Sequence, residues 1–343
     1  MNGAESLVTT LLGSGVDVCF ANPGTSEMHF VAALDGHPEL RCILCLFEGG
    51  TSGAADGYFR MKGDVAATLL HLAPGFGNAF ANLHNARKAH SGVVNIMGDH
   101  ATYHLRYETP LKGNTQGIAQ AISHWTRTSS DGRSVARDGA AAIRAARSNG
   151  GQIATMILPA NTAWEPADGP QVSEAPAPPH RPTDAEIKAA ANMLPLPGAA
   201  LMIDGRALWG EQRLIAEKIA KSTGCRLMCA LFVARLHRGE GSLLGNRMAY
   251  RVADNLPVLT GVSNIVLCGA DRPVSFFAYP DKPILPELPE TRIYELCTPE
   301  MDYMWALEAL ADTLGANKLK LTVEDFQQTI LPALPTGDRK SVV

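Results

Sequence analysis

The chain has 343 residues, of which 46% are hydrophobic and 19% charged, and its formal net charge is -4. This length suits two domains of roughly 150 residues each, and the composition is that of a folded protein. Lysine and arginine form no dense block, which disfavours a nucleic-acid partner. The start lacks a signal-peptide pattern, and no apolar run approaches the roughly 20 residues of a membrane span. A cytoplasmic enzyme without a membrane partner is therefore expected.

Helical patterns alternate with short apolar runs in the first part of the chain. This alternation is typical of a parallel sheet covered by helices. The expected helices span residues 3–13, 26–34, 54–60, 78–88 and 135–147, and the expected strands span residues 16–20, 42–47, 66–72, 93–97 and 153–158.

A proline-rich segment over residues 164–183 is interpreted as a linker, because proline can neither continue a helix nor donate to a sheet. The alternation then resumes. We therefore expect an α/β fold of two doubly wound parallel-sheet domains, over residues 1–163 and 184–330, followed by a tail over residues 331–343. The expected elements of the second domain are helices from Asp184, over 211–222 and over 303–314, and strands over 200–203, 227–232, 265–268 and 292–296.

Several residues of metal-binding or redox types are interpreted as structural. The seven cysteines are an odd number, which argues against a disulfide framework. Cys42 and Cys45 have the spacing of a redox or metal pair, but they lie in an apolar run that is expected to be a buried strand. The methionine and tryptophan residues at 301, 304 and 305 are expected to pack a helix.

Asp99, His100 and His104 have side chains that can bind metals. They lie in an expected loop without a companion set of ligands, so they are interpreted as surface or pocket lining. No metal ligand is predicted within this chain.

Three segments place unusual residues after an expected strand, where open α/β sheets bind ligands. They cover residues 22–27, 46–50 and 71–78, and we expect them to converge on one site. Glu48 follows an apolar strand directly, and a carboxylate is costly to bury there unless something pairs with it. The alternative is a helix N-terminal acid that the helix dipole favours.

The third segment also contains Gly75-x-Gly77 between an expected strand and an expected helix. A dinucleotide loop would place Gly or Ala where Phe80 stands and an acidic residue about 20 positions further on. A nicotinamide site is therefore disfavoured.

Taken together, three motifs resemble the pyrimidine-binding domain of thiamine-diphosphate-dependent enzymes of the acetolactate synthase and benzoylformate decarboxylase group. They are Phe20-Ala-Asn-Pro-Gly-Thr-Ser-Glu, Phe47-Glu-Gly-Gly-Thr-Ser-Gly-Ala-Ala-Asp-Gly-Tyr and His71-Leu-Ala-Pro-Gly-Phe-Gly-Asn, in the order and spacing of that family. The likeness extends to about residue 100 and more loosely to about residue 330. It implies that residues 1–163 are the pyrimidine-binding domain and residues 184–330 a Rossmann-like middle domain.

By this resemblance, Glu48 hydrogen-bonds the N1' nitrogen of the cofactor's aminopyrimidine and favours its imino tautomer. The thiazolium carbon then loses its proton and attacks a 2-oxoacid carbonyl. Pro23 and Gly24 match the turn that lies against the pyrimidine, and Asn78 belongs to the implied cofactor-binding residues.

Thr25 stands where benzoylformate decarboxylase has a substrate-binding serine, and His71 matches the proton-transferring histidine of that enzyme. Typical acetolactate synthases carry a small residue in place of His71 and a glutamine in place of Gly49. The substrate, pyruvate or an aromatic 2-oxoacid, therefore stays open. The alternative for His71 is a histidine that is satisfied structurally near a loop.

Complete enzymes of this group hold Mg²⁺ and the diphosphate with a Gly-Asp-Gly segment and an asparagine in a third domain, and this sequence has no such segment. FAD, which some synthases bind in the middle domain, is not predicted. The resemblance implies a homodimer or tetramer with the active site between subunits.

We therefore interpret the chain as a fragment of a 2-oxoacid decarboxylase or carboligase that is inactive alone. The tail would come from an assembly artefact or a natural truncation. The parent would resemble an acetolactate synthase large subunit. A benzoylformate decarboxylase and a non-catalytic regulatory relative are the alternatives.

Overall fold

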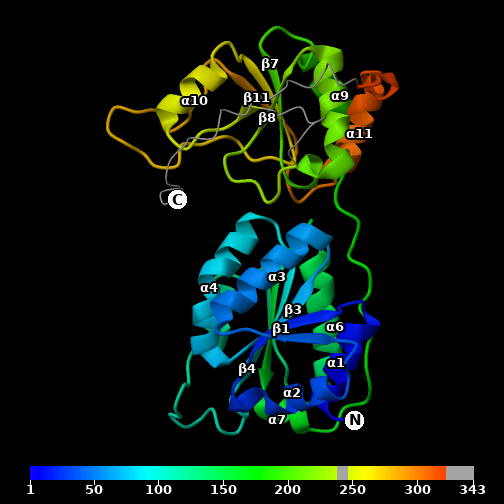
Figure 1. The fold of residues 1–343 in the computed structure, drawn as a ribbon, viewed down its shortest axis with the longest axis vertical. Helices are drawn as coiled ribbons and strands as arrows, with labels where there is room; N and C mark the ends of the chain where they lie inside the picture. Colours follow the sequence, from blue (N-terminus) through cyan, green and yellow to red (C-terminus); the bar gives the residue numbers. More distant parts are fainter. Residues whose placement is uncertain (238–245, 322–343) are drawn as a thin grey trace, which may run out of the picture.

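The structure, a computed structural model, describes residues 1–237 and 246–321 (Figure 1). Its strands form two separate sheets, in which every pairing between neighbouring strands is parallel. The α/β class and the two parallel sheets were both expected from the sequence. The expected tail over residues 331–343 and the last residues of the expected middle domain lie outside the described residues.

The first sheet has six strands in the order β2-β1-β3-β4-β6-β5. Its central strands β1, β3, β4 and β6 are almost wholly buried and apolar, as parallel strands are when helices cover both faces of a sheet. The strands are β1 (Val18–Asn22), β2 (Arg41–Leu44), β3 (Ala66–Leu70), β4 (Val93–Asp99), β5 (Trp125–Thr128) and β6 (Ile153–Pro159).

Two groups of helices cover this sheet, and the members of each group pack against one another. One group consists of α1 (Gly3–Gly13), α2 (Met28–Asp35), α6 (Val135–Arg147) and α7 (Ala160–Trp164), whose apolar side chains join one core cluster. The other consists of α3 (Glu48–Lys62), α4 (Leu72–Lys88) and α5 (Thr115–Gln120), most of whose core side chains join a second cluster.

Helix α1 illustrates how local sequence sets an element. Asn2 and Glu5 form a reciprocal capping box, in which the side chain of each accepts a hydrogen bond from the backbone N–H of the other at 2.9 Å. Leu7 and Leu11, one helical turn apart, are fully buried in the core. The helix therefore begins and faces inward as its sequence pattern predicts.

The second sheet has five strands in the order β11-β10-β7-β8-β9. Helices α8, α9 and α11 pack on one face, and α10 contributes to the core on the other. The strands are β7 (Ala199–Ile203), β8 (Arg226–Cys229), β9 (Asn246–Arg247), β10 (Asn264–Cys268) and β11 (Arg292–Cys297), and the helices are α8 (Asp184–Met193), α9 (Arg213–Thr223), α10 (Val252–Leu259) and α11 (Tyr303–Thr313).

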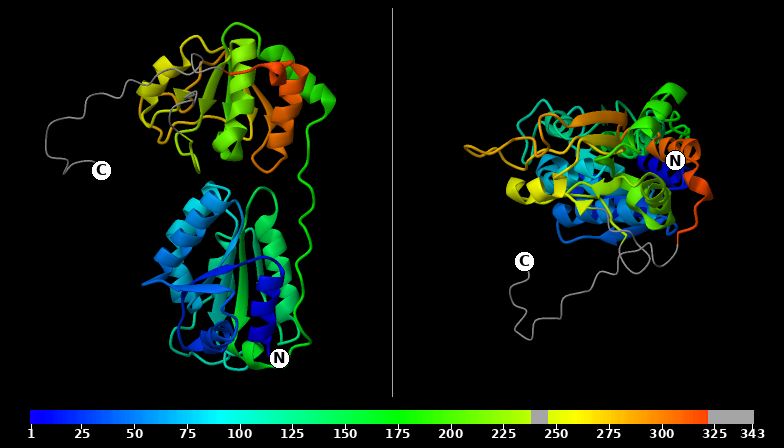
Figure 2. Two further views of the ribbon diagram at one scale, coloured as in Figure 1. Left: turned by 45° about the vertical axis from the view of Figure 1, so that its right-hand side comes forward. Right: turned by 90° about the horizontal axis from the view of Figure 1, so that it is seen from above.

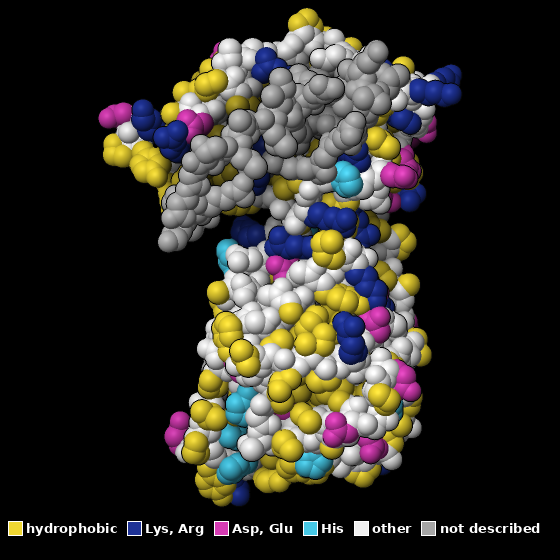
Figure 3. All heavy atoms as spheres, in the orientation of Figure 1, with side chains coloured by type: hydrophobic (Ala, Val, Ile, Leu, Met, Phe, Trp, Pro, Cys, Tyr) yellow, Lys and Arg dark blue, Asp and Glu magenta, His cyan; other side chains and the backbone are white. Residues whose placement is uncertain are grey.

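Residues 167–183 contain neither helix nor strand and run along the first sheet's domain toward the second (Figure 2). Arginines join the two domains directly. Arg60 Nη1 donates to the carbonyl of Ala234 at 3.2 Å, and Arg206 Nη2 donates to the carbonyl of Gly63 at 3.0 Å. Lysine and arginine side chains gather at this junction on the face in Figure 3. Gly63 is the C-cap residue of α3, and the helix dipole at that end favours the positive charge of Arg206.

Several predicted boundaries differ from the observed ones. The expected helices over 3–13 and 135–147 match α1 and α6, and the expected strand over 227–232 ends at Cys229. Five elements were not expected from the sequence, and all of them have eight residues or fewer: α5, α7, α10, β5 and β9. Such short elements carry too few apolar positions to produce a periodic signal.

The expectation of a buried strand around Cys42 and Cys45 is wrong. β2 ends at Leu44 and is the edge strand of the sheet, so Cys42 is exposed and Cys45, beyond the strand, is half-buried. All seven cysteines are free thiols. Among the described residues, no helix combines the length and the apolar character needed to cross a membrane.

Candidate active site

The topology of the first sheet singles out one place at its carboxyl edge for a ligand. The chain leaves β1 for β2 on one side and returns to β3 on the other side of β1, so the strand order reverses between β1 and β3. Ligands of open parallel sheets bind at such a point. Asn22 of β1 pairs with Leu70 of β3, so the segments 23–27 and 71–78 begin side by side there. The segment 46–50 follows β2, the other neighbour of β1.

Glu48 is the first residue of α3, and its side chain is buried, with 6% of the residue exposed. Asn78 Nδ2 donates to its Oε2 at 2.9 Å. Within residues 1–237 and 246–321, this is the only hydrogen bond from a side chain to that carboxylate. The N-terminal end of α3 also favours a negative charge. Glu48 is thus both a buried carboxylate and a helix N-terminal acid.

Small residues let α3 and α4 pack closely around Glu48. Asn82 Nδ2 donates to the carbonyl of Gly49 at 2.7 Å, and Ser52 Oγ donates to the carbonyl of Ala79 at 3.1 Å. Gly75 of α4 lies directly against the carboxylate, because a Cβ at this position would be 2.5 Å from Glu48 Oε1. The glycine in the third segment therefore makes room for the glutamate of the second.

The side chain of His71 lies in a second cluster of polar residues, together with residues that follow β1. Its Nδ1 lies 2.8 Å from Glu27 Oε2 and 3.3 Å from Ser26 Oγ. Glu27 is only 2% exposed. Glu27 has no role among the predictions from the sequence, although it closes the motif of residues 20–27. The missed signal was an acid after one strand end facing a histidine at the end of the neighbouring strand.

The backbone around His71 is tightly constrained. A Cβ at Gly24 would lie between 2.2 and 2.5 Å from three atoms of the imidazole ring. Leu72, directly after His71, is buried with φ of 54°. A bulky residue in this left-handed region costs on the order of 1–3 kcal/mol, and such strain persists where the surrounding structure imposes it. His71 itself is the N-cap residue of α4.

Most of the predicted site residues therefore lie at one edge of the sheet. Glu48 contacts Asn78, and Gly24 contacts His71. Pro23 is half-buried in the same turn as Gly24, whereas Thr25 is exposed and opens a short 3-10 turn.

Asp99 differs from its expected place. It ends β4 instead of lying in a loop, is buried, and accepts a hydrogen bond from Thr115 Oγ1 at 2.7 Å. His100 and His104 contact each other edge to face. The described residues contain no group of three or more His, Cys, Asp or Glu side chains that could hold a metal ion.

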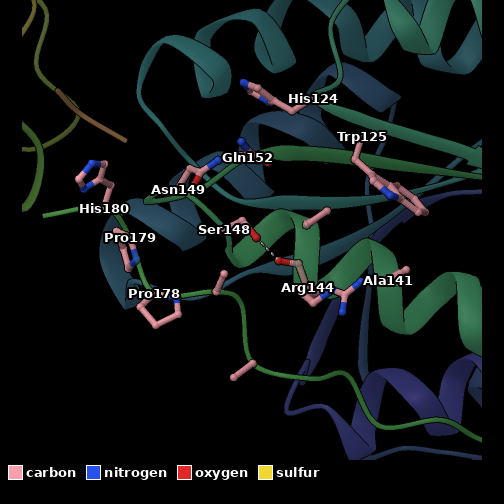
Figure 4. A pocket seen from close by; sticks show the side chains of 13 residues that line it. His124, Trp125, Ala141, Arg144, Ser148, Asn149, Gln152, Pro178, Pro179 and His180 are labelled. Atoms are coloured by element: carbon pink, nitrogen blue, oxygen red, sulfur yellow. Dashed lines mark hydrogen bonds between the residues drawn. The ribbon is translucent and has the colours of Figure 1, made fainter. Parts of the chain in front are cut away.

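A separate cavity of about 610 Å³ lies at the opposite edge of the first sheet (Figure 4). His124 and Gln152, which line it, precede β5 and β6, so they mark the amino ends of these strands. Arg144 of α6 and His180 line it from other sides. Because the candidate active site occupies the carboxyl ends of β1 and β3, this cavity is not part of it.

Comparisons with known proteins show which sequences and folds the chain resembles. Residues 1–124 match the family model "Thiamine pyrophosphate enzyme, N-terminal TPP binding domain". The whole chain is 44% identical to a Mycobacterium tuberculosis protein named as an acetolactate synthase large subunit, IlvX, and spans 65% of its length. A stretch covering 38% of the chain is 32% identical to benzoylformate decarboxylase from Pseudomonas aeruginosa, where it spans 25% of that enzyme.

Solved structures of the same fold are more distant in sequence. A thiamin diphosphate-dependent enzyme from Mycobacterium smegmatis aligns with 94% of the chain and 64% of its own, with a TM-score of 0.80 at 17% identity. A 4-hydroxybenzoylformate decarboxylase from Rhodococcus jostii RHA1 aligns with 100% of the chain and 66% of its own, with a TM-score of 0.74 at 20% identity. The match over residues 1–124 and the likeness of the whole chain to the Mycobacterium tuberculosis protein support a place in the family of thiamine-diphosphate-dependent enzymes.

Proposed function

We propose that the carboxyl edge of the first sheet binds the pyrimidine half of thiamine diphosphate, with Glu48 as its essential acid. The burial of Glu48 carries this proposal. Among the described residues, Glu48 has one neutral side-chain partner and no cationic one. A buried ionisable group of this kind suits a carboxyl that exchanges a proton with a ligand. The fit of the site supports it further, because Gly75 leaves one face of the carboxylate without a side chain.

Each residue of this site would have a separate role in binding the cofactor. Glu48 would hold the proton shared with the pyrimidine ring, and Asn78 would fix the orientation of the carboxylate. Pro23 and Gly24 would form the turn against the ring. When bound, thiamine diphosphate supplies a nucleophilic carbon and an electron sink for decarboxylation. Mg²⁺ for the diphosphate would be held outside the described residues, and FAD is not part of the proposal.

We further propose that the whole protein decarboxylates a 2-oxoacid and is a carboligase of the acetolactate synthase large-subunit type, in branched-chain amino acid biosynthesis in the cytoplasm. It would act as a homodimer or tetramer with active sites between subunits. The 44% identity to the Mycobacterium tuberculosis protein supports this reading. His71, together with Thr25 as a proposed substrate contact, favours a second candidate, a benzoylformate-type decarboxylase.

The test compares Glu48→Gln with the unchanged sequence in the full product of the gene that encodes this chain. With thiamine diphosphate and Mg²⁺ present, CO₂ release from pyruvate and from benzoylformate should fall by about 10²- to 10⁴-fold. Glu39→Gln makes the same chemical change on an exposed residue and should leave the rate unchanged. An undiminished rate in Glu48→Gln would refute the role of Glu48 and favour a non-catalytic relative.

The substrate preference separates the two candidate reactions. Faster turnover of pyruvate, with a second carbonyl compound as acceptor, supports the carboligase. Faster turnover of benzoylformate supports the decarboxylase. The 343-residue chain alone is expected to release no CO₂ from either acid, and steady release by the purified chain would contradict that expectation.

A further inference from the structure

Glu27 is a buried carboxylate that the proposed cofactor chemistry does not use. Only 2% of the residue is exposed, although no lysine or arginine pairs with it among the described residues. Burying a carboxylate without compensation is costly, so the groups that surround it must stabilise its charge.

Two donors and one imidazole nitrogen converge on the two oxygens of Glu27. The backbone N–H of Gly24 donates to Oε2 at 2.7 Å, and Ser26 Oγ donates to Oε1 at 2.5 Å. The third group is His71 Nδ1, 2.8 Å from Oε2. Hydrogen bonds from a backbone N–H and a hydroxyl both favour the ionised carboxylate, which can only accept.

An ionised Glu27 fixes where the proton of His71 lies. Since the carboxylate has no hydrogen to give, the hydrogen of the 2.8 Å contact must sit on Nδ1. The hydroxyl hydrogen of Ser26 points to Glu27, so it does not compete for Nδ1. In the neutral ring, Nε2 is then bare and basic.

Close packing leaves this pair little freedom. A Cβ at Gly98 would be 1.6 Å from Glu27 Oε1, and a Cβ at Gly24 would be 2.2 Å from the nearest atom of the His71 ring. Glycine at both positions lets backbone from β4 and from the turn after β1 contact the pair directly. Neither side chain can turn far without a clash.

We propose that Glu27 is a positioning residue that holds His71 as the Nδ1–H tautomer, so that Nε2 is the atom that exchanges protons with the substrate. The inference rests on the proposed function, in which His71 meets a 2-oxoacid. The ring would take or return a proton at Nε2 while Nδ1–H stays bonded to Glu27. Glu27 itself stays ionised throughout and does not touch the substrate.

Two histidines of the same chain provide internal references for a direct test. His37 Nδ1 lies 2.9 Å from the carbonyl of Ala33, so it must carry a hydrogen. His124 Nδ1 accepts a hydrogen bond from the N–H of Ile153 at 3.0 Å, so it must be bare. The two residues therefore represent the two tautomers in one sample.

The experiment records two-bond ¹H–¹⁵N correlations of the ¹⁵N-histidine-labelled chain at about pH 8, above the roughly 6.5 at which an unperturbed histidine titrates. Single His→Gln variants assign the three rings. His71 should show the pattern of His37, with Nδ1 protonated. A bare Nδ1, as in His124, would overturn the proposal, because it would mean that Glu27 is the protonated partner.

The variant Glu27→Ala tests whether Glu27 is what fixes the tautomer of His71, and Ser26→Ala is its control. Glu27→Ala should shift His71 toward the Nε2–H tautomer, while Ser26→Ala should leave Nδ1 protonated. In the full gene product, Glu27→Ala should lower kcat by about 10²-fold with little change in the concentration of thiamine diphosphate that half-saturates the enzyme. An unchanged tautomer in folded Glu27→Ala would refute the proposal. Since the spectrum needs no substrate, its outcome is independent of the test of Glu48.

Discussion

Gly75 and Gly77 lie two residues apart in α4 and differ in what a methyl group would meet. At Gly75 a Cβ would be 2.5 Å from Glu48 Oε1, whereas at Gly77 the nearest atom is Ile118 Cδ1 at 3.8 Å, an ordinary contact. Both positions are helical, so replacement by alanine gains about 1 kcal/mol of helix propensity at each. Comparing alanine variants at the two sites therefore distinguishes an effect on the packing of Glu48 from an effect on the stability of the helix.

We therefore expect Gly75→Ala to displace the carboxylate of Glu48 and lower the rate of CO₂ release at least about tenfold, since misplaced catalytic groups lose that much or more. Gly77→Ala should keep the rate and slightly raise the melting temperature. Assays of the full gene product and thermal melts measure both effects. Equal rates for the two variants would show that Gly75 is not needed for the position of Glu48.

Single residues also mark how far the sequence predicts the candidate site. Glu48 was found because a carboxylate directly after an apolar strand conflicts with its surroundings, a conflict visible in one segment. Glu27 was missed because its significance lies in the distance between its carboxylate and the imidazole of His71, 44 positions away. Strand order brings these residues together, and no local pattern contains that order.

At the scale of elements, helix α3 and its C-cap contain two glycines whose positions favour different residue types. Gly57 is exposed inside the helix, and a Cβ there meets no atom within 4 Å. Gly63 is the C-cap residue, with φ of 80°, and its N–H donates to the carbonyl of Phe59 at 2.7 Å. A helix interior favours alanine, while a left-handed C-cap favours glycine.

Gly57→Ala should therefore raise the free energy of unfolding by about 0.5–1 kcal/mol, and Gly63→Ala should lower it by about 1–2 kcal/mol. Urea denaturation of both variants measures the difference. Because both variants replace glycine by alanine at the same helix, each is the control for the other. Two shifts of the same sign would contradict the assignment of the C-cap.

Element boundaries show which parts of the fold the sequence determines. Helices α1 and α6 were predicted to the residue because their apolar positions recur over three turns or more. β2 was predicted as buried because its residues are apolar, yet it is an exposed edge strand. Apolar composition indicates a strand, but the place of that strand in the sheet depends on the path of the whole chain.

At the scale of the whole molecule, both sheets have a point where their strand order reverses, but the residues at the two points differ. In the first sheet this point is occupied by Glu27 and His71. In the second sheet it lies between β7 and β10, where a Cβ at Gly205 or at Gly269 would come within 2.6 Å of Tyr303. Tyr303 of α11 therefore fills the space between these strand ends, and its hydroxyl accepts a hydrogen bond from the N–H of Arg206.

Asp204 lies beside Tyr303 at the end of β7 and couples stability to pH. Burial raises the pKa of its carboxyl from 3.8 to about 6, with the N–H of Gly205 opposing the shift and Asp271 adding to it. A raised pKa means that the folded chain binds this proton more tightly than the unfolded chain. The contribution of Asp204 to stability is therefore fully present below pH 3.8 and is lost as the pH rises through about 6.

Asp204→Asn should remove this dependence, because an amide does not titrate and its oxygen can still accept the hydrogen bond from Gly205. The variant and the unchanged chain should be about equally stable near pH 4. Near pH 7 the variant should be more stable by up to about 3 kcal/mol, from about two pKa units at 1.36 kcal/mol each. Urea denaturation across this range measures the difference. Asp281→Asn, an exposed control, should shift stability equally at every pH. An equally constant difference for Asp204→Asn would mean that folding does not raise the pKa of Asp204.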